Sequence, residues 1–171
     1  MTTASAYPAS AQQAKRDTPG KEVTGLTDSR TAQADVATCV FSVLKTIVEG
    51  DPGVASCTYE QTPTDAQGLP CITMQTLDGT PVERRYLDGS RVENYRFALL
   101  LRRQALEDQD RLDARALLER VASSLAEADV ELGEGRTAWD LSLDTLPYRA
   151  ESAADYADWK AELTLKYQTN R

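Results

Sequence analysis

The sequence predicts an α+β fold, in which a mostly antiparallel sheet is covered on one face by two helices. Three observations support this prediction. Apolar residues recur at helical spacing in two separate segments, residues 34–48 and 110–128. Most other segments alternate apolar with polar residues, or are short and rich in residues that favour strands. Glycine and proline separate these segments, which together give the order α-β-β-β-β-α-β-β.

The first predicted helix begins at Ala34. Its apolar residues form one stripe over about four turns, and they are Val36, Val40, Val43, Leu44, Ile47 and Val48. The sequence Gly-Asp-Pro-Gly at residues 50–53 ends the helix, because proline and glycine both disfavour its continuation. Residues 54–60 then predict a short strand, and residues 62–70, with two prolines and a glycine, predict a loop.

A Leu-Asp-Gly triplet occurs twice, at residues 77–79 and 87–89. Asp-Gly pairs supply the positive φ that tight turns between strands need. The two triplets therefore predict a meander of three strands, at residues 71–77, 82–86 and 95–101. The last of these carries alternating apolar residues, so one of its faces is expected to line the core.

The second predicted helix covers residues 110–128. Asp108 and Asp110 lie where the positive end of the helix dipole favours acidic groups. Two strands follow this helix. The first contains Trp139, Leu141 and Leu143 in alternation with polar residues. The second, residues 157–167, has the clearest alternation in the chain, which places Trp159 on an apolar face and the intervening charged residues on a wet face.

Residues 1–33 differ from the rest of the chain in composition. They are rich in Ala, Thr, Ser and Gln and contain few large apolar residues. Such a segment cannot bury enough surface to offset its chain entropy. We therefore expect a flexible N-terminal arm followed by a single domain, residues 34–171, with no core element before Ala34. The arm either becomes ordered against a partner or is a tail without a function.

The composition excludes several classes of function. The 171 residues include no histidine, which removes Ser–His and Cys–His nucleophile pairs and every metal site that contains histidine. The 19 Lys and Arg against 27 Asp and Glu give a net charge of −8, which disfavours a protein that wraps nucleic acid. No apolar run has the length of a membrane span, and the first thirty residues lack the apolar core of a secretion signal.

The residues that remain do not form a recognisable catalytic or metal motif. Three cysteines, spaced by 18 and 14 residues, lack the close pairs of zinc sites and the even count of disulfide frameworks, so we expect buried free thiols; they are Cys39, Cys57 and Cys71. Asp140 and Asp144, or Asp155 and Asp158, are near in sequence, but alternation puts Asp140, Asp144 and Asp158 on polar faces. Without burial, the pKa of a carboxyl stays in its usual range. We therefore predict no enzyme, no cofactor and no metal.

One basic group stands out in the domain, namely Arg84 and Arg85 with Arg91 and Arg96 nearby. A nucleic-acid patch is one interpretation of this group. Acidic residues interleave with it, namely Glu83, Asp88 and Glu93, which favours strand faces joined by salt bridges. With no reactive constellation, the chain has the features of an interaction protein.

Three short motifs follow one another in residues 80–103. A proline precedes a strand, residues 84–90 have the sequence Arg-Arg-Tyr-Leu-Asp-Gly-Ser, and a polar step leads into the apolar strand at 95–101. This order resembles the minor capsid or tail-terminator proteins of long-tailed (siphovirus-type) bacteriophages. The first helix running into Asp-Pro-Gly-Val, the helix at 110–128 and the final strand with its aromatic end are also similar to that family. The resemblance covers about residues 36–168, and the 33-residue arm departs from it.

The resemblance implies a virion structural protein at the neck of a phage, made in the cytoplasm of the host bacterium. Tail terminators form a ring, usually of six subunits, on the head-proximal end of the tail tube. The ring ends tube polymerisation and joins the tail to the head. The implied partners are further copies of the chain, the major tail tube protein and the head–tail connector. DNA would pass through the lumen without specific binding, which suits an acidic wall.

A ring needs head-to-tail contacts, in which two different surfaces of the subunit meet. From charge complementarity we predict that Arg84, Arg85 and Arg91 dock against Glu131 and Glu134 of a neighbour.

Two other classes remain open. A small acidic cytosolic binding or inhibitor module would be a monomer or dimer and bind a basic partner. An enzyme that uses carboxylates would need a buried acidic pair in a cleft.

Overall fold

The computed structural model describes residues 25–64, 68–104, 107–133, 135–150 and 156–170, with side chains in the first helix described from Asp35 onward. Within these residues the element order is the predicted one. The helices are α1 (Gly25–Glu49) and α2 (Asp108–Ala126), and the strands are β1 (Ser56–Tyr59), β2 (Cys71–Thr76), β3 (Val82–Arg85), β4 (Arg91–Gln104), β5 (Arg136–Arg149) and β6 (Tyr156–Thr169).

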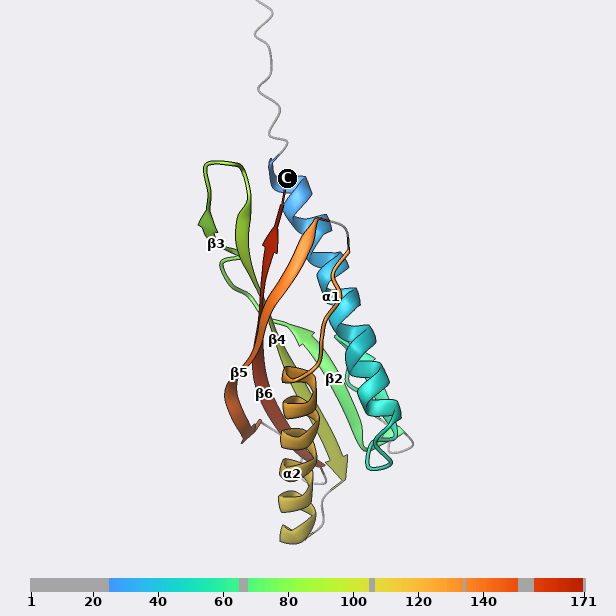
Figure 1. Cartoon of the computed structure of the whole chain (residues 1–171). Coiled ribbons are helices and arrows are strands. Elements are labelled where there is room, and N and C mark those ends of the chain that lie inside the picture. Colours follow the sequence, from blue (N-terminus) through green and yellow to red (C-terminus); the bar gives the residue numbers. More distant parts are fainter. Residues whose placement is uncertain (1–24, 65–67, 105–106, 134, 151–155, 171) are drawn as a thin grey trace, which may run out of the picture.

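The six strands form one sheet in the order β1-β2-β4-β6-β5, and β3 pairs with β4 beside this path. Strand β1 runs parallel to β2, while the other paired strands are antiparallel. Both helices lie on the same face of the sheet (Figure 1). The predicted α+β class is therefore confirmed.

The core lies between that face and the helices. Helix α1 contributes its predicted stripe, with Val36, Val40 and Leu44 fully buried. Helix α2 contributes a second stripe, which consists of Ala114, Leu117, Leu118, Val121, Ala122 and Leu125. Its first turn is closed by a hydrogen bond from the Glu107 N–H to the Asp110 carboxylate, 3.2 Å long. Asp110, one of the two acidic residues predicted at the start of this helix, is therefore part of its N-terminal cap.

Strands β4 and β6 are the centre of the sheet. They pair without interruption from Arg91↔Thr169 to Gln104↔Tyr156. Because side chains alternate between the two faces, the buried residues of β6 occur at every second position from Ala161 to Tyr167. The predicted alternation in the last strand is confirmed, although Trp159 is only half-buried.

The predicted three-strand meander is wrong at its first turn. Strands β2 and β3 both pair antiparallel with β4 and therefore run in the same direction along its edge. Between them the chain keeps bonding to β4, because the Leu77 N–H donates to the Arg96 carbonyl (3.0 Å) and the Asn94 N–H donates to the Pro81 carbonyl (2.7 Å). Gly79 does not adopt a positive φ, whereas Gly89 does, at 90°. Only the Asp88-Gly89 pair reverses the chain.

Two side chains on the polar face of the sheet differ from the sequence prediction. The pairing of β5 with β6 shifts register between Ala138 and Asp140, so Trp139 lies at a bulge and is 51% exposed, where alternation placed it in the core. Asp158 is on the predicted polar face but is 2% exposed. The Arg102 side chain and the Pro63 region cover it, which alternation within one strand cannot reveal.

Helix α1 begins at Gly25, before the predicted start at Ala34. Residues 1–24 of the predicted arm lie outside the described residues.

The turn after α1 is tied to α2 through Asp51. Its carboxylate accepts hydrogen bonds from the Gly53 N–H (2.9 Å) and from Nε and Nη2 of Arg120 (3.0 and 2.8 Å). Burial raises the pKa of Asp51, but the hydrogen bonds from Gly53 and Arg120 outweigh burial and hold the pKa below its usual value.

This arrangement predicts a loss of stability in acid. A carboxyl with a lower pKa in the folded state stabilises the fold above its unfolded pKa, and the contribution is lost as the pH falls below about 4. We expect Asp51→Asn to unfold with a weaker dependence on pH than the parent in this range, as measured by urea unfolding at a series of pH values. Asp78→Asn, at an exposed carboxyl, is the control. Parallel pH profiles for the parent and Asp51→Asn would contradict the prediction.

Candidate interaction surfaces

The β3–β4 hairpin presents an apolar tip. The Asp88 carboxylate accepts hydrogen bonds from the N–H and hydroxyl of Ser90, at 2.9 and 2.7 Å. These bonds lower the pKa of Asp88. Backbone bonds from Tyr86 N–H to the Ser90 carbonyl (3.0 Å) and from Gly89 N–H to the Tyr86 carbonyl (3.2 Å) close the turn. The turn is therefore well fixed, yet Leu87 at its tip is fully exposed and Tyr86 is 40% exposed.

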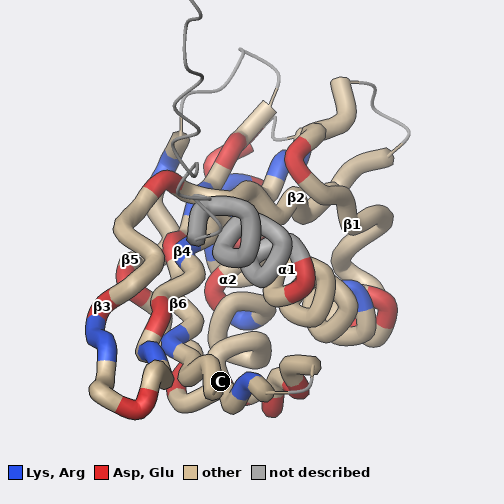
Figure 2. The backbone as a smooth tube through the Cα atoms, turned by 90° about the horizontal axis from the view of Figure 1, so that it is seen from above, with Lys and Arg blue, Asp and Glu red and all other residues tan. Residues whose placement is uncertain are grey.

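The predicted basic residues lie along this hairpin. Arg84 and Arg85 are exposed on β3 and, within the described part of the chain, make no salt bridge. Arg91 begins β4 and lies 3.7 Å from the buried carboxylate of Glu93. Glu93 also accepts a hydrogen bond from the Thr169 hydroxyl, 3.0 Å long. Arg91 thus has an acidic neighbour within its own chain, whereas Arg84 and Arg85 do not make a salt bridge with any described residue; in Figure 2 the basic stretch of β3 lies on the outside of the molecule.

The predicted salt bridges between strand faces are present for other members of this group, namely Glu83 and Arg96. Lys166 pairs with Glu83 at 2.9 Å, and Arg96 lies 3.7 Å from Glu162. Lys160 lies 3.1 Å from Glu162. Hydrogen bonds from Lys160 and Tyr148 lower the pKa of Glu162.

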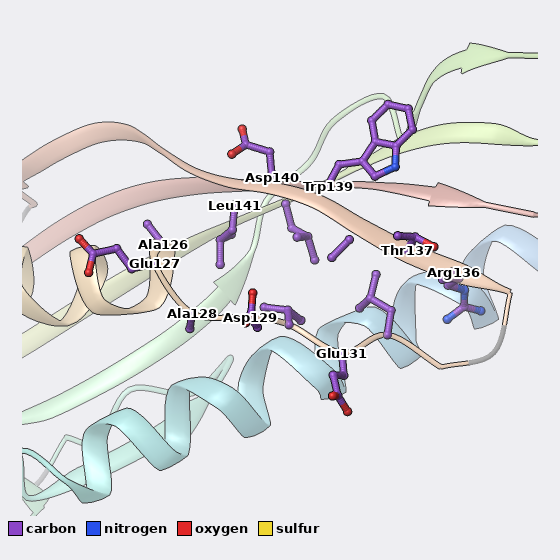
Figure 3. Close-up of a pocket in the computed structure, with 14 residues that line it drawn as sticks. Ala126, Glu127, Ala128, Asp129, Glu131, Arg136, Thr137, Trp139, Asp140 and Leu141 are labelled. Atoms are coloured by element: carbon purple, nitrogen blue, oxygen red, sulfur yellow. The ribbon is translucent and has the colours of Figure 1, made fainter.

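A second surface is formed by the chain between α2 and β5. Residues 126–132 and 136–141, with Leu165 of β6, line a cavity of about 530 Å³ (Figure 3). Its apolar lining includes Val130 and Leu141, which are buried, and Leu132, which is half-buried. Three exposed acidic residues of the segment after α2 surround this lining, namely Glu127, Asp129 and Glu131, whereas the exposed Asp140 projects from the other side of β5 (Figure 3).

The charges around the cavity are unbalanced. Among the described residues none of the four acids makes a salt bridge, while Arg136, at one end of the cavity, lies 3.6 Å from the Asp35 carboxylate. Figure 3 shows Glu127 and Glu131 pointing outward, and Trp139 projecting from the opposite side of β5. The cavity therefore combines an apolar floor with a negatively charged margin.

The predicted interface residues lie on two separate surfaces of the subunit. Arg84 and Arg85 are on β3 and Glu131 is beside β5, which are the two edges of the sheet in this half of the molecule (Figure 1). Glu134 lies outside the described residues. Within the described residues no salt bridge joins the two surfaces, so the predicted pairs would need two copies of the chain.

The structure also places the groups considered for chemistry. Asp140 and Asp144 are exposed, Asp155 lies outside the described residues, and Asp158 is paired with Arg102. The cysteines are free as predicted, but only Cys71 is fully buried, while Cys39 and Cys57 are half-buried. Burial raises the pKa of the Cys57 thiol to about 11, so this thiol is protonated at neutral pH. In the described ranges no three His, Cys, Asp or Glu residues are grouped as metal ligands. No helix in those ranges is long and apolar enough to cross a membrane.

The cavity was missed by the sequence reasoning. Its only signal in the sequence is the alternation of acidic and apolar residues at 127–132 after α2. That pattern does not say which strand the segment will lie against.

Comparison with known proteins bears on the fold. No family model and no curated protein matches the chain. Among solved structures, a chain of the virion of a native gene transfer agent particle covers 80% of this chain and 93% of its own length, with a TM-score of 0.52 and 18% identity. The two chains share a fold. A second solved structure, of a protein without a descriptive name, covers 81% of this chain and 97% of its own length, with a TM-score of 0.52 and 10% identity.

Proposed function

We propose that the protein is a structural component of a phage-like virion, and that it forms a ring of six copies on the head-proximal end of the tail tube. In this role the ring ends tube polymerisation and joins the tail to the head–tail connector. The observation that carries the proposal is the fold shared with a virion chain over 80% of this sequence. The ordered motifs in residues 80–103, which resemble tail terminators, support the finer assignment.

The distribution of charge agrees with such a role. A ring is built from a head-to-tail contact between two different surfaces of each subunit. The basic β3 edge and the acidic cavity beside β5 are two such surfaces, with opposite charge. The net charge of −8 also suits a wall along which DNA slides without binding. The proposed function depends on the shape of the protein and on its interfaces, and it needs no catalytic step and no cofactor.

The test is the mass of the assembly. The purified protein is measured by native mass spectrometry and electron microscopy, alone and with isolated tail tubes of the same virion. We expect closed rings of six subunits that cap one end of each tube. A single copy or a two-fold dimer at the tube end would contradict the proposal.

The acidic cavity also fits the second candidate, a small binding module that takes a basic partner. That candidate requires a monomer or dimer that ignores tail tubes, so the same measurement separates the two functions.

The N-terminal arm provides a further prediction. Deleting residues 1–24 removes no part of the described helices and strands, because α1 begins at Gly25. We expect unchanged circular dichroism and an unchanged thermal midpoint, but fewer tailed particles, because an arm that orders on a neighbour adds contact area to the neck. Loss of the fold would show that the arm belongs to the core. Unchanged tail attachment would show that the arm has no role in joining.

A further inference from the structure

We infer that the tip of the β3–β4 hairpin of one subunit inserts Leu87 into the acidic cavity beside β5 of the next subunit. This inference rests on the proposed ring and assigns its subunit contact. The occupant of the cavity is thus a second copy of this chain.

The hairpin tip has the properties of an interface anchor. Leu87 is fully exposed and Tyr86 is 40% exposed, so two large apolar side chains meet water at one point of the surface. The Asp88–Ser90 hydrogen bonds and the positive φ of Gly89 hold the turn in one conformation. Because the turn is already ordered, it loses little conformational entropy on binding, which favours insertion of the tip in this conformation.

The cavity has the properties of a receptor for that tip. Its volume of about 530 Å³ exceeds what one leucine fills, and its floor includes the apolar side chains of Val130, Leu132 and Leu141. None of the residues that line it comes from the hairpin of the same subunit. Strands β4 and β6 separate the two surfaces, so the tip and the cavity of one subunit stay apart.

The charges beside the tip and the cavity are complementary. Arg84 and Arg85 adjoin the tip, and Glu127, Asp129 and Glu131 surround the cavity. None of these five makes a salt bridge within the described part of its own subunit. Insertion of Leu87 would bring the unpaired positive and negative groups together, which steers the subunits and sets their register. Each copy carries one tip and one cavity at opposite edges of its sheet, and this is the arrangement of a head-to-tail assembly.

Leu87→Asp tests the anchor. A negative charge at the tip would meet an apolar floor and an acidic margin, so we expect the association constant of each subunit contact to fall about thirtyfold, as for loss of a hot-spot residue, and the ring fraction in the presence of tail tubes to fall with it. The fold should persist, because the Leu87 side chain is fully exposed. Leu112→Asp is the matched control, since Leu112 is a second exposed leucine, on α2 and away from both surfaces. Native mass spectrometry gives the ring fraction, and circular dichroism checks the fold.

Charge reversal provides an independent test. The double variant Arg84→Glu, Arg85→Glu should assemble poorly, and more so at low salt, where repulsion is least screened. Adding Glu127→Lys and Glu131→Lys to the same chain should restore assembly. Failure of this restoration would overturn the pairing of the two surfaces.

Disulfide cross-linking distinguishes the proposed insertion of Leu87 from the proposed ring. The variant Leu87→Cys, Leu132→Cys should form a ladder of disulfide-linked oligomers on mild oxidation, whereas Leu112→Cys, Leu132→Cys should not. Rings without the ladder, or rings that tolerate Leu87→Asp, would overturn the insertion while the proposed function stands. A ladder of open chains without rings would support the insertion and contradict the ring. Monomers with tail tubes and no ladder would contradict both.

Discussion

Replacing Asp158 by alanine is expected to lower the free energy of unfolding by about 3–5 kcal/mol. The Asp158 carboxylate is 2% exposed and accepts two hydrogen bonds from Arg102, from Nε at 2.9 Å and from Nη2 at 2.7 Å. Arg102 also donates to the Pro63 carbonyl at 3.1 Å, and its guanidinium lies 5.7 Å from the centre of the Tyr156 ring. Without the carboxylate, the half-buried guanidinium of Arg102, whose side chain is 22% exposed, keeps its charge but loses its partner of opposite charge.

Urea unfolding measures this loss of stability. Two further variants test whether the loss comes from the ion pair. Asp140→Ala, at an exposed carboxylate of β5, should change the stability by no more than about 0.5 kcal/mol. The double variant Arg102→Met, Asp158→Leu should recover most of the loss, since replacing both partners of a buried ion pair leaves no uncompensated charge. Equal stability of Asp158→Ala and Asp140→Ala would show that the ion pair does not contribute to the fold.

A second large effect is expected for Phe97→Ala, which should cost about 3–5 kcal/mol. Phe97 is fully buried on β4 and stacks against Tyr95, with ring centres 5.6 Å apart. The substitution leaves a cavity at the centre of the core. Against a typical total of about 5–15 kcal/mol, this loss removes a large part of the stability.

The control for Phe97 is Trp139, an exposed aromatic residue of β5. Trp139→Ala should change the midpoint of thermal unfolding little, because the bulge turns Trp139 toward water. If Trp139→Ala destabilised the isolated subunit as much as Phe97→Ala, the position of the bulge would be wrong.

The helices and strands could be predicted because their signals are local. The stripe from Val36 to Val48 and the alternation from Ala161 to Tyr167 both follow from the geometry of one element, 3.6 or 2 residues per repeat. The element order followed from these repeats and from the glycines and prolines between them. The basic group of Arg84 and Arg85 was also visible, since charged residues on a short strand beside a tight turn are expected at the surface.

The candidate surfaces could be predicted only in part. The sequence pointed to opposite charges at residues 84–91 and 131–134, but the alternation at 127–132 does not say that this segment lines a cavity against β5. The lining of that cavity comes from the segment after α2, from β5 and from Leu165 of β6, which meet only in the folded chain. The exposure of Leu87 likewise depended on the tertiary structure. Leu87 lies in the turn between β3 and β4, beyond their last paired residues, Arg85 and Arg91, and no other element of the described structure covers it.

The sequence by itself determined the α+β class and the faces that the two helices and the strands β4 and β6 turn to the core, because the period of apolar residues is a property of one segment. Only the tertiary structure decided that β2 and β3 lie end to end along β4, that Trp139 faces water, and that Asp158 is buried with Arg102. Each of these depends on pairing between residues far apart in the chain. Non-local pairing is selected by the packing of the whole sheet, and the order of residues within one strand does not contain it.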